Sequence, residues 1–466
     1  MAHIKFGTDG WRGVIADDFT FEELRKVSLA TAQYFSKHKK AKNGIVIGYD
    51  ARFLSKEFAE VAAQTIASAG VKVLLADHIA TTPMVSLGVV RLSAAGGVVI
   101  TASHNPAKYN GFKIKGDFGG PAHPEMIDEV EKFLAPIQTM KELPIKLLPF
   151  NELLKKKKIE LVNYTAIYLN DLQSKIEFDL IKNEHLKIVF DAMYGAGQGV
   201  AQLFYPQLIT LRNSFNPSFG GAHPEPLAQN LQELMLDVRL NNAHIGFATD
   251  GDADRVGAVD ENGNFVDSHR IFAILLKYLV EHRLYKGEVV KSLSVSELIN
   301  KMCAKYKIKL HETAVGFKHL CRLMTEKKII IAGEESGGIG VMGHLPERDG
   351  IFIGFLLAEV MSVRRMKLSE LVKELFDEFG EHHYNRVDKL LTTKDKDRII
   401  KICKSNPKKI GEFKITKIDS TDGFKFYTKD GWLLVRASGT EPLLRFYAES
   451  DSPKKVSAML KAVMAL

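Results

Sequence analysis

Three aspartates alternate with small residues in the segment TDGDADR, residues 249–255. Asp250, Asp252 and Asp254 repel one another unless a cation lies between them, because their carboxylates stand so close along the chain. Oxygen ligands on a tight loop of small residues suit Mg²⁺. A solvated acidic turn is the alternative, but the segment follows an apolar run and ends in Arg255. We therefore expect a magnesium site in this segment.

A serine stands in a comparable position in VITASHNPAKYNGFK, residues 99–113. The apolar run before it predicts a buried strand, and open α/β sheets place their ligands at the carboxyl ends of such strands. Ser103 could accept a phosphoryl group, whose transfer needs an in-line approach and a cation on the phosphoryl oxygens. Mg²⁺ held by the aspartates and by Ser103 would supply that cation. A tight turn bonded through its Ser and Asn side chains is the alternative.

Two side chains close to this serine in the sequence could move a proton to or from a substrate hydroxyl. They are His104 and Lys113, and both residue types serve as general acids and bases. The sequence does not decide which of the two does so. Taken alone, Lys113 could equally be a surface lysine.

A donor-rich loop near the C-terminus, RASGTEPLLR at residues 436–445, is suited to an anion. Glycine lets backbone N–H groups approach a ligand, hydroxyls add donors, and an arginine fork matches a phosphate. A helix that began near Glu441 and Pro442 would add its positive end. The loop supplies the donors Arg436, Ser438, Gly439, Thr440 and Arg445.

A fourth polar segment, GEESGG at residues 333–338, is rich in carboxylates and glycine. Carboxylates accept hydrogen bonds from the hydroxyl groups of a polyol, so this segment could hold a sugar. A glycine-rich turn without a ligand explains the same composition equally well.

Three of these polar segments each follow the third strand of a repeated pattern of strand, helix, strand, helix, strand. That pattern predicts parallel α/β layers, and three copies at intervals of about 100–140 residues predict three related domains. If the carboxyl ends of the third strands turn inward, one cleft receives all three segments. The expected strands are residues 44–50, 71–75 and 97–100, then 186–191, 208–211 and 243–248, then 288–293, 308–310 and 328–332.

The last part of the chain has a different pattern. After an expected helix at residues 368–379, short strands alternate with helices over residues 383–466. Asp-Gly pairs at 422–423 and 430–431 favour antiparallel strands joined by tight turns. The sequence therefore predicts a small C-terminal α+β domain, which carries the RASGTEPLLR loop.

The composition is that of an ordinary globular protein, with 466 residues, 45% hydrophobic and 26% charged. A net charge of +8 fits a phosphorylated metabolite as well as a nucleic acid, but no basic stripe is interleaved with aromatics. Three scattered cysteines favour a reducing compartment. The N-terminus is not a signal peptide, and no apolar run is long enough to span a bilayer. We expect a cytoplasmic protein that binds neither nucleic acid nor membrane.

The four segments in this order resemble the α-D-phosphohexomutases, the family of phosphoglucomutase and phosphomannomutase. FGTDGWRG, residues 6–13, resembles the N-terminal signature of that family, and TASHNPAKYNGFK resembles its active-site serine loop. DGDADR resembles its metal loop, GEESGG its sugar-binding loop and RASGTEP its phosphate-binding loop. The resemblance covers essentially the whole chain, and TASHNP together with DGDADR is highly specific.

The resemblance implies three related α/β domains with mixed, largely parallel sheets and a smaller C-terminal α+β domain, heart-shaped around a central cleft. The implied domains are residues 1–150, 151–255, 256–372 and 373–466. Hexose phosphates are the implied substrates, Mg²⁺ the implied metal and glucose 1,6-bisphosphate the implied activator and intermediate. The oligomeric state is not implied.

The resemblance also assigns roles to residues of this chain. Ser103 is implied to be phosphorylated in the resting enzyme, and the three aspartates to hold Mg²⁺. Lys113 is implied to take part in proton transfer, and Arg12 and Arg255 to line the reacting end. The implied sugar and phosphate contacts are Glu334, Ser336, Lys318, His319, Arg436, Ser438, Gly439 and Thr440.

The implied reaction passes the phosphoryl group of phosphoserine to a hexose phosphate, which becomes a 1,6-bisphosphate, turns over and returns the other phosphate. Glutamine and histidine in the form GEQSGH are typical of relatives acting on glucosamine phosphate, whereas this chain has Glu335 and Gly338. We expect the conversion of glucose 1-phosphate to glucose 6-phosphate. Mannose phosphate, alone or with glucose phosphate, is the main alternative, and glucosamine phosphate is a further one. A phosphatase and a non-catalytic sugar-phosphate binder are the rivals from other classes.

Overall fold

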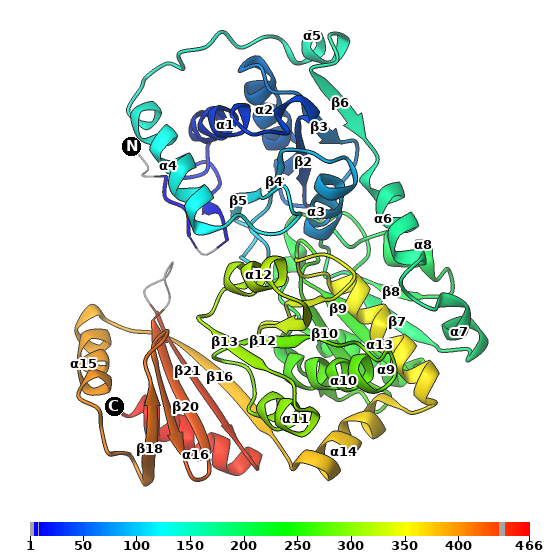
Figure 1. The fold of residues 1–466 in the computed structure, drawn as a ribbon, viewed down its shortest axis with the longest axis vertical. Helices are drawn as coiled ribbons and strands as arrows, with labels where there is room; N and C mark the ends of the chain where they lie inside the picture. Colours follow the sequence, from blue (N-terminus) through cyan, green and yellow to red (C-terminus); the bar gives the residue numbers. More distant parts are fainter. Residues whose placement is uncertain (1–3, 8, 438–442) are drawn as a thin grey trace.

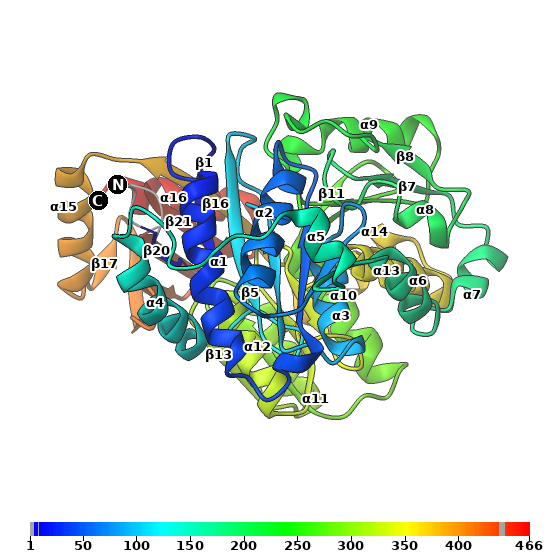
Figure 2. The same cartoon turned by 90° about the horizontal axis from the view of Figure 1, so that it is seen from above.

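The computed structural model describes residues 4–7, 9–437 and 443–466. Four β-sheets follow one another along the chain, and we refer to each sheet with its helices as domains I to IV (Figure 1). Domain I lies at the top of Figure 1, domains II and III form the middle, and domain IV lies at the lower left. Figure 2 shows domain IV at one end of the molecule and the domain II helix α7 (Phe178–Asn183) at the other.

Domain I has a six-stranded sheet in the order β1-β5-β4-β2-β3-β6. The pairs of β2 with β3 and β4, and of β3 with β6, are parallel, whereas β5 runs antiparallel to both β4 and β1. Its elements are β1 (Trp11–Val14), α1 (Phe21–Ser36), β2 (Ile45–Tyr49), α2 (Ser55–Ser68), β3 (Val73–Ala76), α3 (Thr82–Arg91), β4 (Gly96–Ile100), β5 (Tyr109–Lys115), α4 (Pro124–Gln138), α5 (Phe150–Lys155) and β6 (Ile159–Val162).

Domain II has a five-stranded sheet in the order β11-β10-β9-β7-β8. The chain enters it through α6 (Tyr164–Gln173) and α7. The predicted boundaries at residues 150 and 255 fall before the last strands of the first two sheets. The other elements are β7 (Ile188–Asp191), α8 (Ala201–Phe204), β8 (Ile209–Leu211), α9 (Gln232–Leu240), β9 (Ile245–Thr249), β10 (Val256–Asp260) and β11 (Phe265–Val266).

Domain III has a four-stranded sheet in the order β13-β12-β14-β15. Its helix α13 is buried almost throughout and packs against α7 and β9 of domain II as well as α10, which explains why its sequence is apolar on all sides. The elements are α10 (Ser268–Glu281), β12 (Glu288–Ser292), α11 (Leu298–Tyr306), β13 (Leu310–Thr313), α12 (Phe317–Glu326), β14 (Ile329–Gly333), β15 (Ile339–Val341), α13 (Gly350–Arg364) and α14 (Leu368–Phe379).

The predicted threefold repeat is confirmed by the strand orders. In each α/β domain the first strand of the repeat (β2, β7 or β12) lies between the second and the third strands of the repeat. A fourth strand then pairs antiparallel with the third. These fourth strands, β5, β10 and β15, were not expected from the sequence. Each polar segment is therefore the loop that connects a third strand to the antiparallel fourth strand. The three connections are residues 101–108, 250–255 and 334–338.

Domain IV is the predicted α+β domain, with an antiparallel sheet in the order β16-β21-β20-β19-β18-β17 and a core of its own. The helix expected near Glu441 is wrong, because the chain from Leu443 pairs with both neighbouring strands of the sheet. The elements are β16 (His383–Leu390), α15 (Thr393–Lys404), β17 (Lys409–Ile410), β18 (Phe413–Asp419), β19 (Phe424–Thr428), β20 (Gly431–Ala437), β21 (Leu443–Ser450) and α16 (Pro453–Met464).

Two further sequence expectations concern the membrane and the cysteines. Among the described residues, the helices are all too short or too polar to cross a bilayer. Cys303, Cys321 and Cys403 are buried and carry free thiols. The large core extends through domains I, II and III as one continuous cluster of buried apolar side chains, so these three domains pack as a unit.

Candidate active site

The serine loop of domain I meets the aspartate loop of domain II. Ser103 is buried, has the left-handed φ of +53°, and its Oγ donates a hydrogen bond to Oδ2 of Asp250 at 2.8 Å. A Cβ on Gly251 would lie 2.2 Å from the carbonyl oxygen of Ser103, so only glycine permits this approach. The structure therefore brings together the two groups that the sequence expects to meet, although they are 147 residues apart.

Arg52, which was not expected from the sequence, holds the serine loop, residues 101–108. Its guanidinium is fully buried and donates hydrogen bonds of 2.6–3.0 Å to four carbonyl oxygens in the loop and directly after it. Asp50 holds the guanidinium at Nε and also accepts a hydrogen bond from the hydroxyl of Thr101. Because all four carbonyls bond one rigid fork, the backbone around Ser103 is fixed. The four carbonyls belong to Ser103, Asn105, Pro106 and Tyr109.

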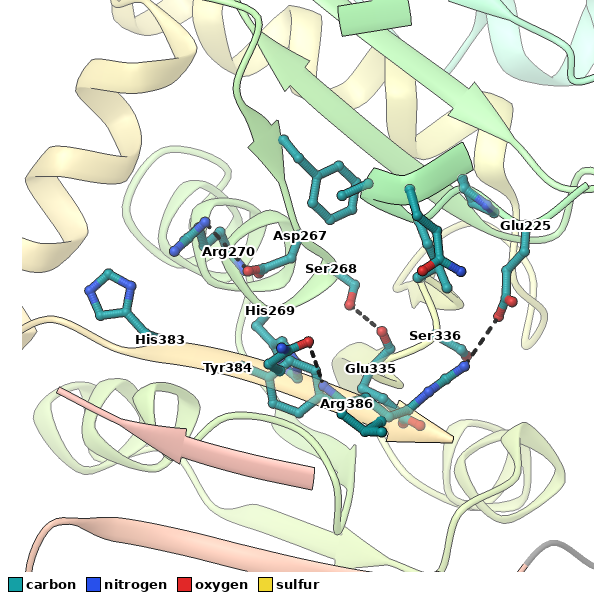
Figure 3. Close-up of a pocket in the computed structure, with 18 of the residues that line it drawn as sticks. Glu225, Asp267, Ser268, His269, Arg270, Glu335, Ser336, His383, Tyr384 and Arg386 are labelled. Carbon is teal, nitrogen blue, oxygen red and sulfur yellow. Dashed lines mark hydrogen bonds and ion pairs between the residues drawn. The ribbon is translucent and has the colours of Figure 1, made fainter. Parts of the chain in front are cut away.

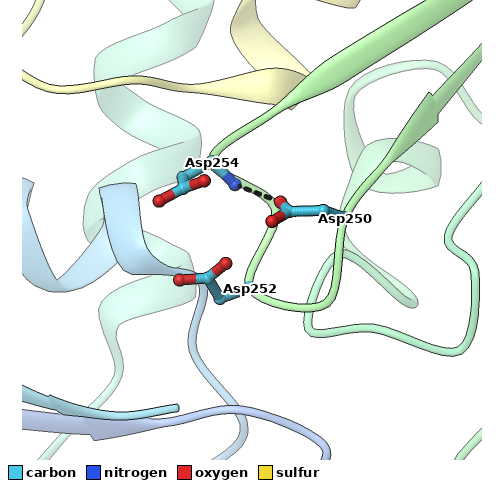
Figure 4. Close-up of side chains that lie close together, drawn as sticks. All are labelled: Asp250, Asp252 and Asp254. Atoms are coloured by element: carbon cyan, nitrogen blue, oxygen red, sulfur yellow. Dashed lines mark hydrogen bonds between the residues drawn. The ribbon is translucent and has the colours of Figure 1, made fainter. Parts of the chain in front are cut away.

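The three aspartates are buried and face one another (Figure 4). One carboxylate oxygen from each lies within 4.8 Å of the others. Oδ1 of Asp250 accepts the backbone N–H groups of Asp254 at 2.9 Å and of Arg255 at 3.1 Å, which closes the loop. Oδ1 of Asp252 and Oδ1 of Asp254 are buried with no hydrogen-bond partner among the residues that the structure describes.

Those two unpartnered oxygens test whether the residues fit the expected Mg²⁺. A buried carboxylate oxygen without a donor is unfavourable, and a divalent cation with oxygen ligands would satisfy both atoms at once. Asp250 and the hydroxyl of Ser103 stand beside them and complete a set of hard oxygen ligands. The cluster therefore fits the cation.

Lys113 reaches this cluster from β5 and is itself fully buried. Its Nζ lies 2.8 Å from Asp252, 3.3 Å from Asp254 and 2.9 Å from Asp9. Arg348 adds a second cation, 2.7 Å from Asp254 and 3.0 Å from Asp9. The two cations engage Oδ2 of Asp252 and Asp254. Oδ1 of Asp254 has only the more distant Nε of Arg255, at 4.0 Å, so both Oδ1 atoms can accept a ligand.

The charges of this cluster shift its pKa values in opposite directions. Burial raises the pKa of Asp250 well above its usual range, and the neighbouring aspartates add to this effect. Burial acts the same way on Asp252, but the pKa of Asp252 falls below its usual range because Lys113 and Thr82 hold the carboxylate. Burial lowers the pKa of Lys113, yet Asp252, Asp254 and Asp9 outweigh burial and raise it. Lys113 is therefore a fixed cation.

His104 lies on the other side of the serine. Its Nδ1 is 3.4 Å from Oγ of Ser103. The pKa of His104 lies well below its usual range, chiefly because of burial and further because of nearby arginines. Those arginines are Arg255, Arg12, Arg386 and Arg445, so side chains from domains I, II and IV surround this histidine with positive charge. Such a surface attracts phosphate groups.

Arg12 and Arg255, which were expected to line the reacting end, each have a side-chain hydrogen-bond partner. Arg12 donates to the side chain of Asn105 in the serine loop, and Arg255 donates to Glu225 at 3.1 Å. Burial lowers the pKa of Arg12, whereas Glu225 and the aspartates keep the pKa of Arg255 above its usual value against the effect of burial. Both side chains therefore lie where the sequence analysis expects them, beside the serine and aspartate loops.

The GEESGG segment of domain III, residues 333–338, adjoins the aspartate loop, and we call it the sugar loop after its expected role. Val256 donates its backbone N–H to the carbonyl of Gly337 at 3.1 Å, and Arg348 links the two loops. Glu334 accepts the backbone N–H of Gly316 at 2.7 Å. Glu335 accepts the hydroxyl of Ser294 at 2.5 Å.

A cavity of about 860 Å³ lies beside the sugar loop, between domains II, III and IV (Figure 3). Ser336 and Glu335 line it, and Arg386 lies in it opposite Glu225. Ser103 and the three aspartates are not among the lining residues, so the cavity adjoins the sugar loop and not the serine.

The remaining predicted contacts lie on domains III and IV. Lys318 and His319 stand in the first turn of α12. Arg436 and Arg445 are directly paired across β20 and β21, which places both on one face of the sheet. Ser438, Gly439 and Thr440 lie outside the described residues.

Comparison with known proteins places these features in a family. Models of the phosphoglucomutase/phosphomannomutase family match α/β/α domain I at residues 3–140, domain II at 166–263, domain III at 267–379 and the C-terminal domain at 392–466. The chain belongs to the α-D-phosphohexomutase family. The resemblance stated above is thus confirmed, and the protein is an isomerase that acts as an intramolecular phosphotransferase.

Relatives of this phosphohexomutase carry different substrate names. A phosphoglucosamine mutase of Carboxydothermus hydrogenoformans is 33% identical over 99% of this chain and 98% of its own. A phosphoglucomutase/phosphomannomutase of Thermococcus kodakarensis is 29% identical over 98% of this chain and 96% of its own. A crystal structure from Thermus thermophilus, named as a phosphomannomutase, superposes with a TM-score of 0.87 at 31% identity and covers 100% and 99% of the two chains.

Several residues at the phosphohexomutase site could not be found from sequence patterns. Arg52 follows a strand as an ordinary Asp-Ala-Arg turn, and Arg348 stands in a loop with no chemical motif. Arg386 lies on a strand that shows no anion-binding pattern. Asp9 is the exception, because it belongs to FGTDGWRG, which the resemblance already marked.

Glu334 makes the stability of the phosphohexomutase depend on pH. Burial raises its pKa from 4.5 to about 7, so between these values the folded protein holds more protons than the unfolded chain. The free energy of unfolding then falls as pH rises, by at most about 1.4 kcal/mol per pH unit from this group. Glu334→Gln removes that slope, which urea unfolding at pH 5, 6 and 7 measures.

Glu335→Gln is the matched control for this prediction. Burial raises the pKa of Glu335, but the hydroxyl of Ser294 and Arg386 outweigh burial and bring it below its usual value. Its contribution is therefore present above about pH 4.5 and is lost in more acidic solution. A Glu334→Gln protein with the wild-type slope between pH 5 and 7 would contradict the assignment.

Proposed function

We propose that the enzyme interconverts glucose 1-phosphate and glucose 6-phosphate through a phosphoserine at Ser103 and a glucose 1,6-bisphosphate intermediate. The observation that carries the proposal is the 2.8 Å hydrogen bond between Ser103 and Asp250. It joins a nucleophilic hydroxyl to a carboxylate cluster that fits a cation. Such a pair suits phosphoryl transfer better than simple binding.

In the proposed reaction, the bond between Oγ of Ser103 and phosphorus breaks as a free sugar hydroxyl forms a new bond to the same phosphorus. The sugar hydroxyl gives its proton to a base of the protein. The bisphosphate then turns over, and its other phosphorus–sugar oxygen bond breaks as Oγ of Ser103 forms a new bond to that phosphorus. The base returns its proton to the sugar oxygen, which leaves the isomeric monophosphate and restores the phosphoserine. When bound by Asp250, Asp252, Asp254 and Ser103, Mg²⁺ would offset negative charge on the phosphoryl oxygens.

His104 is the better supported of the two candidate proton carriers. Its Nδ1 lies 3.4 Å from Oγ of Ser103, so its imidazole stands next to the group that carries the phosphoryl in this proposal. Lys113, by contrast, is bonded to three carboxylates, so its ammonium group is committed to neutralising them. We assign Lys113 to holding the charge of the cluster and His104 to moving the proton.

In this proposal, one pair of arginines binds the phosphoryl group that is transferred and another pair binds the phosphate at the other end of the substrate. Arg12 and Arg255 would hold the phosphoryl group in transit. Arg436 and Arg445, with Ser438, Gly439 and Thr440, would hold the phosphate that does not react. A domain IV that opens and closes would let the bisphosphate turn without escaping.

Glucose is favoured over glucosamine by the sugar loop. A Cβ on Gly338 would lie 2.4 Å from Cδ of Arg348, so the histidine of GEQSGH has no room here unless Arg348 moves. Arg348 in turn is bonded to Asp254 and Asp9. Glucosamine phosphate is nevertheless a second candidate because of the 33% identical relative, and mannose phosphate a third because of the relative from Thermococcus kodakarensis.

A coupled assay with glucose 1-phosphate, Mg²⁺ and a trace of glucose 1,6-bisphosphate tests the proposal. We expect glucose 6-phosphate to form. Release of inorganic phosphate would indicate a phosphatase, and no product would indicate a binder. Parallel kcat/KM values for the phosphates of glucose, mannose, glucosamine and N-acetylglucosamine then rank the substrates, and glucose is expected to rank first.

Arg52→Lys is expected to lower kcat roughly 100-fold with little change in KM. The ammonium of lysine cannot reach four carbonyl oxygens in one plane, so the serine loop loses its fixed shape. A displacement of about 1 Å at a reacting group costs about this much. Steady-state kinetics measure the effect, with the exposed Arg239→Lys as control. A wild-type kcat in Arg52→Lys would show that the loop holds its shape without the guanidinium.

A further inference from the structure

Asp422 lies in the turn between β18 and β19 and joins two domains. Its Oδ2 accepts the Nε–H of Arg436 at 2.9 Å, within domain IV. The same oxygen accepts the backbone N–H of Val315 in domain III, also at 2.9 Å. Both side chains are mostly covered, with exposed fractions of 23% for Asp422 and 13% for Arg436.

The turn that carries Asp422 lies very close to the backbone of β20. Gly423 has a φ of +87°, and a Cβ on it would lie 2.5 Å from the carbonyl oxygen of Val435 and 3.1 Å from Cα of Arg436. The backbone of the turn is therefore pressed against β20. This contact holds the carboxylate of Asp422 beside the guanidinium.

In domain III, the carboxylate of Asp422 accepts a backbone N–H just before the start of α12. Val315 and Gly316 precede this helix, and their consecutive N–H groups are taken by two carboxylates, Asp422 from domain IV and Glu334 from the sugar loop. Carboxylates stabilise the positive end of a helix. The first turn of α12 carries Lys318 and His319.

We propose that Asp422 is a positioning residue that couples Arg436 of domain IV to the α12 turn of domain III. The proposal rests on the proposed function, in which Arg436 holds the phosphate, and on the expected substrate contacts of Lys318 and His319 in the α12 turn. Among the described residues, the contact that Arg436 makes uses only its Nε. A phosphate that binds the terminal nitrogens would then meet a guanidinium that Asp422 already holds at a fixed position against the α12 turn.

Removal of the carboxylate is expected to weaken substrate binding more than turnover. Asp422→Ala frees Arg436 and the amide of Val315, so domain IV no longer closes on a fixed partner. A hydrogen bond to a charged group changes an equilibrium by roughly ten- to a hundredfold. We expect KM for glucose 1-phosphate to rise by about tenfold or more, with kcat reduced by less than threefold and more bisphosphate released per turnover.

Asp419→Ala is the matched control. Asp419 is the last residue of β18, directly before the same turn, and its Oδ1 accepts the backbone N–H of Thr421 at 2.8 Å, a contact confined to domain IV. Kinetics are measured for both variants, together with amide hydrogen exchange at Val315 in the protein without substrate. We expect exchange at Val315 to accelerate about tenfold or more in Asp422→Ala and to stay unchanged in Asp419→Ala.

The outcomes separate this proposal from the proposed function. If the wild type converts none of the hexose phosphates, the proposed function fails, while exchange at Val315 still decides whether Asp422 holds domain III. Unchanged exchange at Val315 in Asp422→Ala overturns the coupling. An equal fall of kcat and kcat/KM in Asp422→Ala with KM unchanged also overturns it, since the residue would then not position the phosphate site.

Discussion

Ser103→Ala is expected to lower turnover by a factor of roughly 10⁴ or more while leaving substrate binding nearly intact. The alanine side chain has no atom that can take the phosphoryl group, and the neighbouring groups cannot replace it. His104 and the three aspartates stay in place, because Arg52 holds the loop through backbone carbonyls and not through the hydroxyl. Steady-state assays measure turnover, and calorimetric titration with glucose 6-phosphate measures binding.

A control variant distinguishes loss of the nucleophile from the general effect of removing a serine hydroxyl near the site. Ser336→Ala removes a hydroxyl from the sugar loop, outside the reacting centre, and is expected to raise KM with a much smaller loss of kcat. Ser103→Ala with near-normal turnover would exclude the covalent route. Loss of binding in Ser103→Ala would instead show that the hydroxyl shapes the pocket.

Lys113→Met is expected to destabilise the protein by about 3–5 kcal/mol and to abolish activity. Asp9 and Asp254 would keep the guanidinium of Arg348, but Asp252 would lose the ammonium group that forms its ion pair among the described residues. Leaving buried carboxylates without their cation is among the most costly single changes in a protein interior. Urea unfolding measures the free energy.

Added MgCl₂ is expected to restore part of the lost stability in Lys113→Met and to stabilise this variant more than the wild type. A cation that binds only the folded state raises the free energy of unfolding, and the variant has a larger uncompensated negative charge. The exposed Lys158→Met serves as control and should unfold like the wild type. Equal stability of Lys113→Met and wild type would show that the carboxylates are held apart by other means.

The sequence predicted the chemistry of the site more fully than the contacts that support it. Ser103 and Asp250 were expected to meet because both follow the third strand of a repeated unit, and strand order does bring them together. Arg52 and Asp422 were not found, because each acts through backbone groups far along the chain. Such partners are set by tertiary packing and leave no local spacing.

The two departures from the expected fold have related causes. The antiparallel strands β10 and β15 follow the polar segments directly, so their apolar residues were interpreted as the ends of loops and not as strands. The helix expected after RASGTEP was inferred from a proline that often begins helices. The structure instead continues as β21, whose pairing with β16 along eight residues and with β20 along seven outweighs that local preference.

The central claim is that the phosphoryl group rests on Ser103 between its two transfers. Incubation with glucose 1,6-bisphosphate labelled in its phosphates, followed by digestion and mass spectrometry, measures this directly. We predict one labelled phosphoryl group, carried by the peptide that contains Ser103, which unlabelled glucose 1-phosphate removes at least as fast as kcat. Label on another residue, no covalent label, or removal slower than turnover would contradict the account.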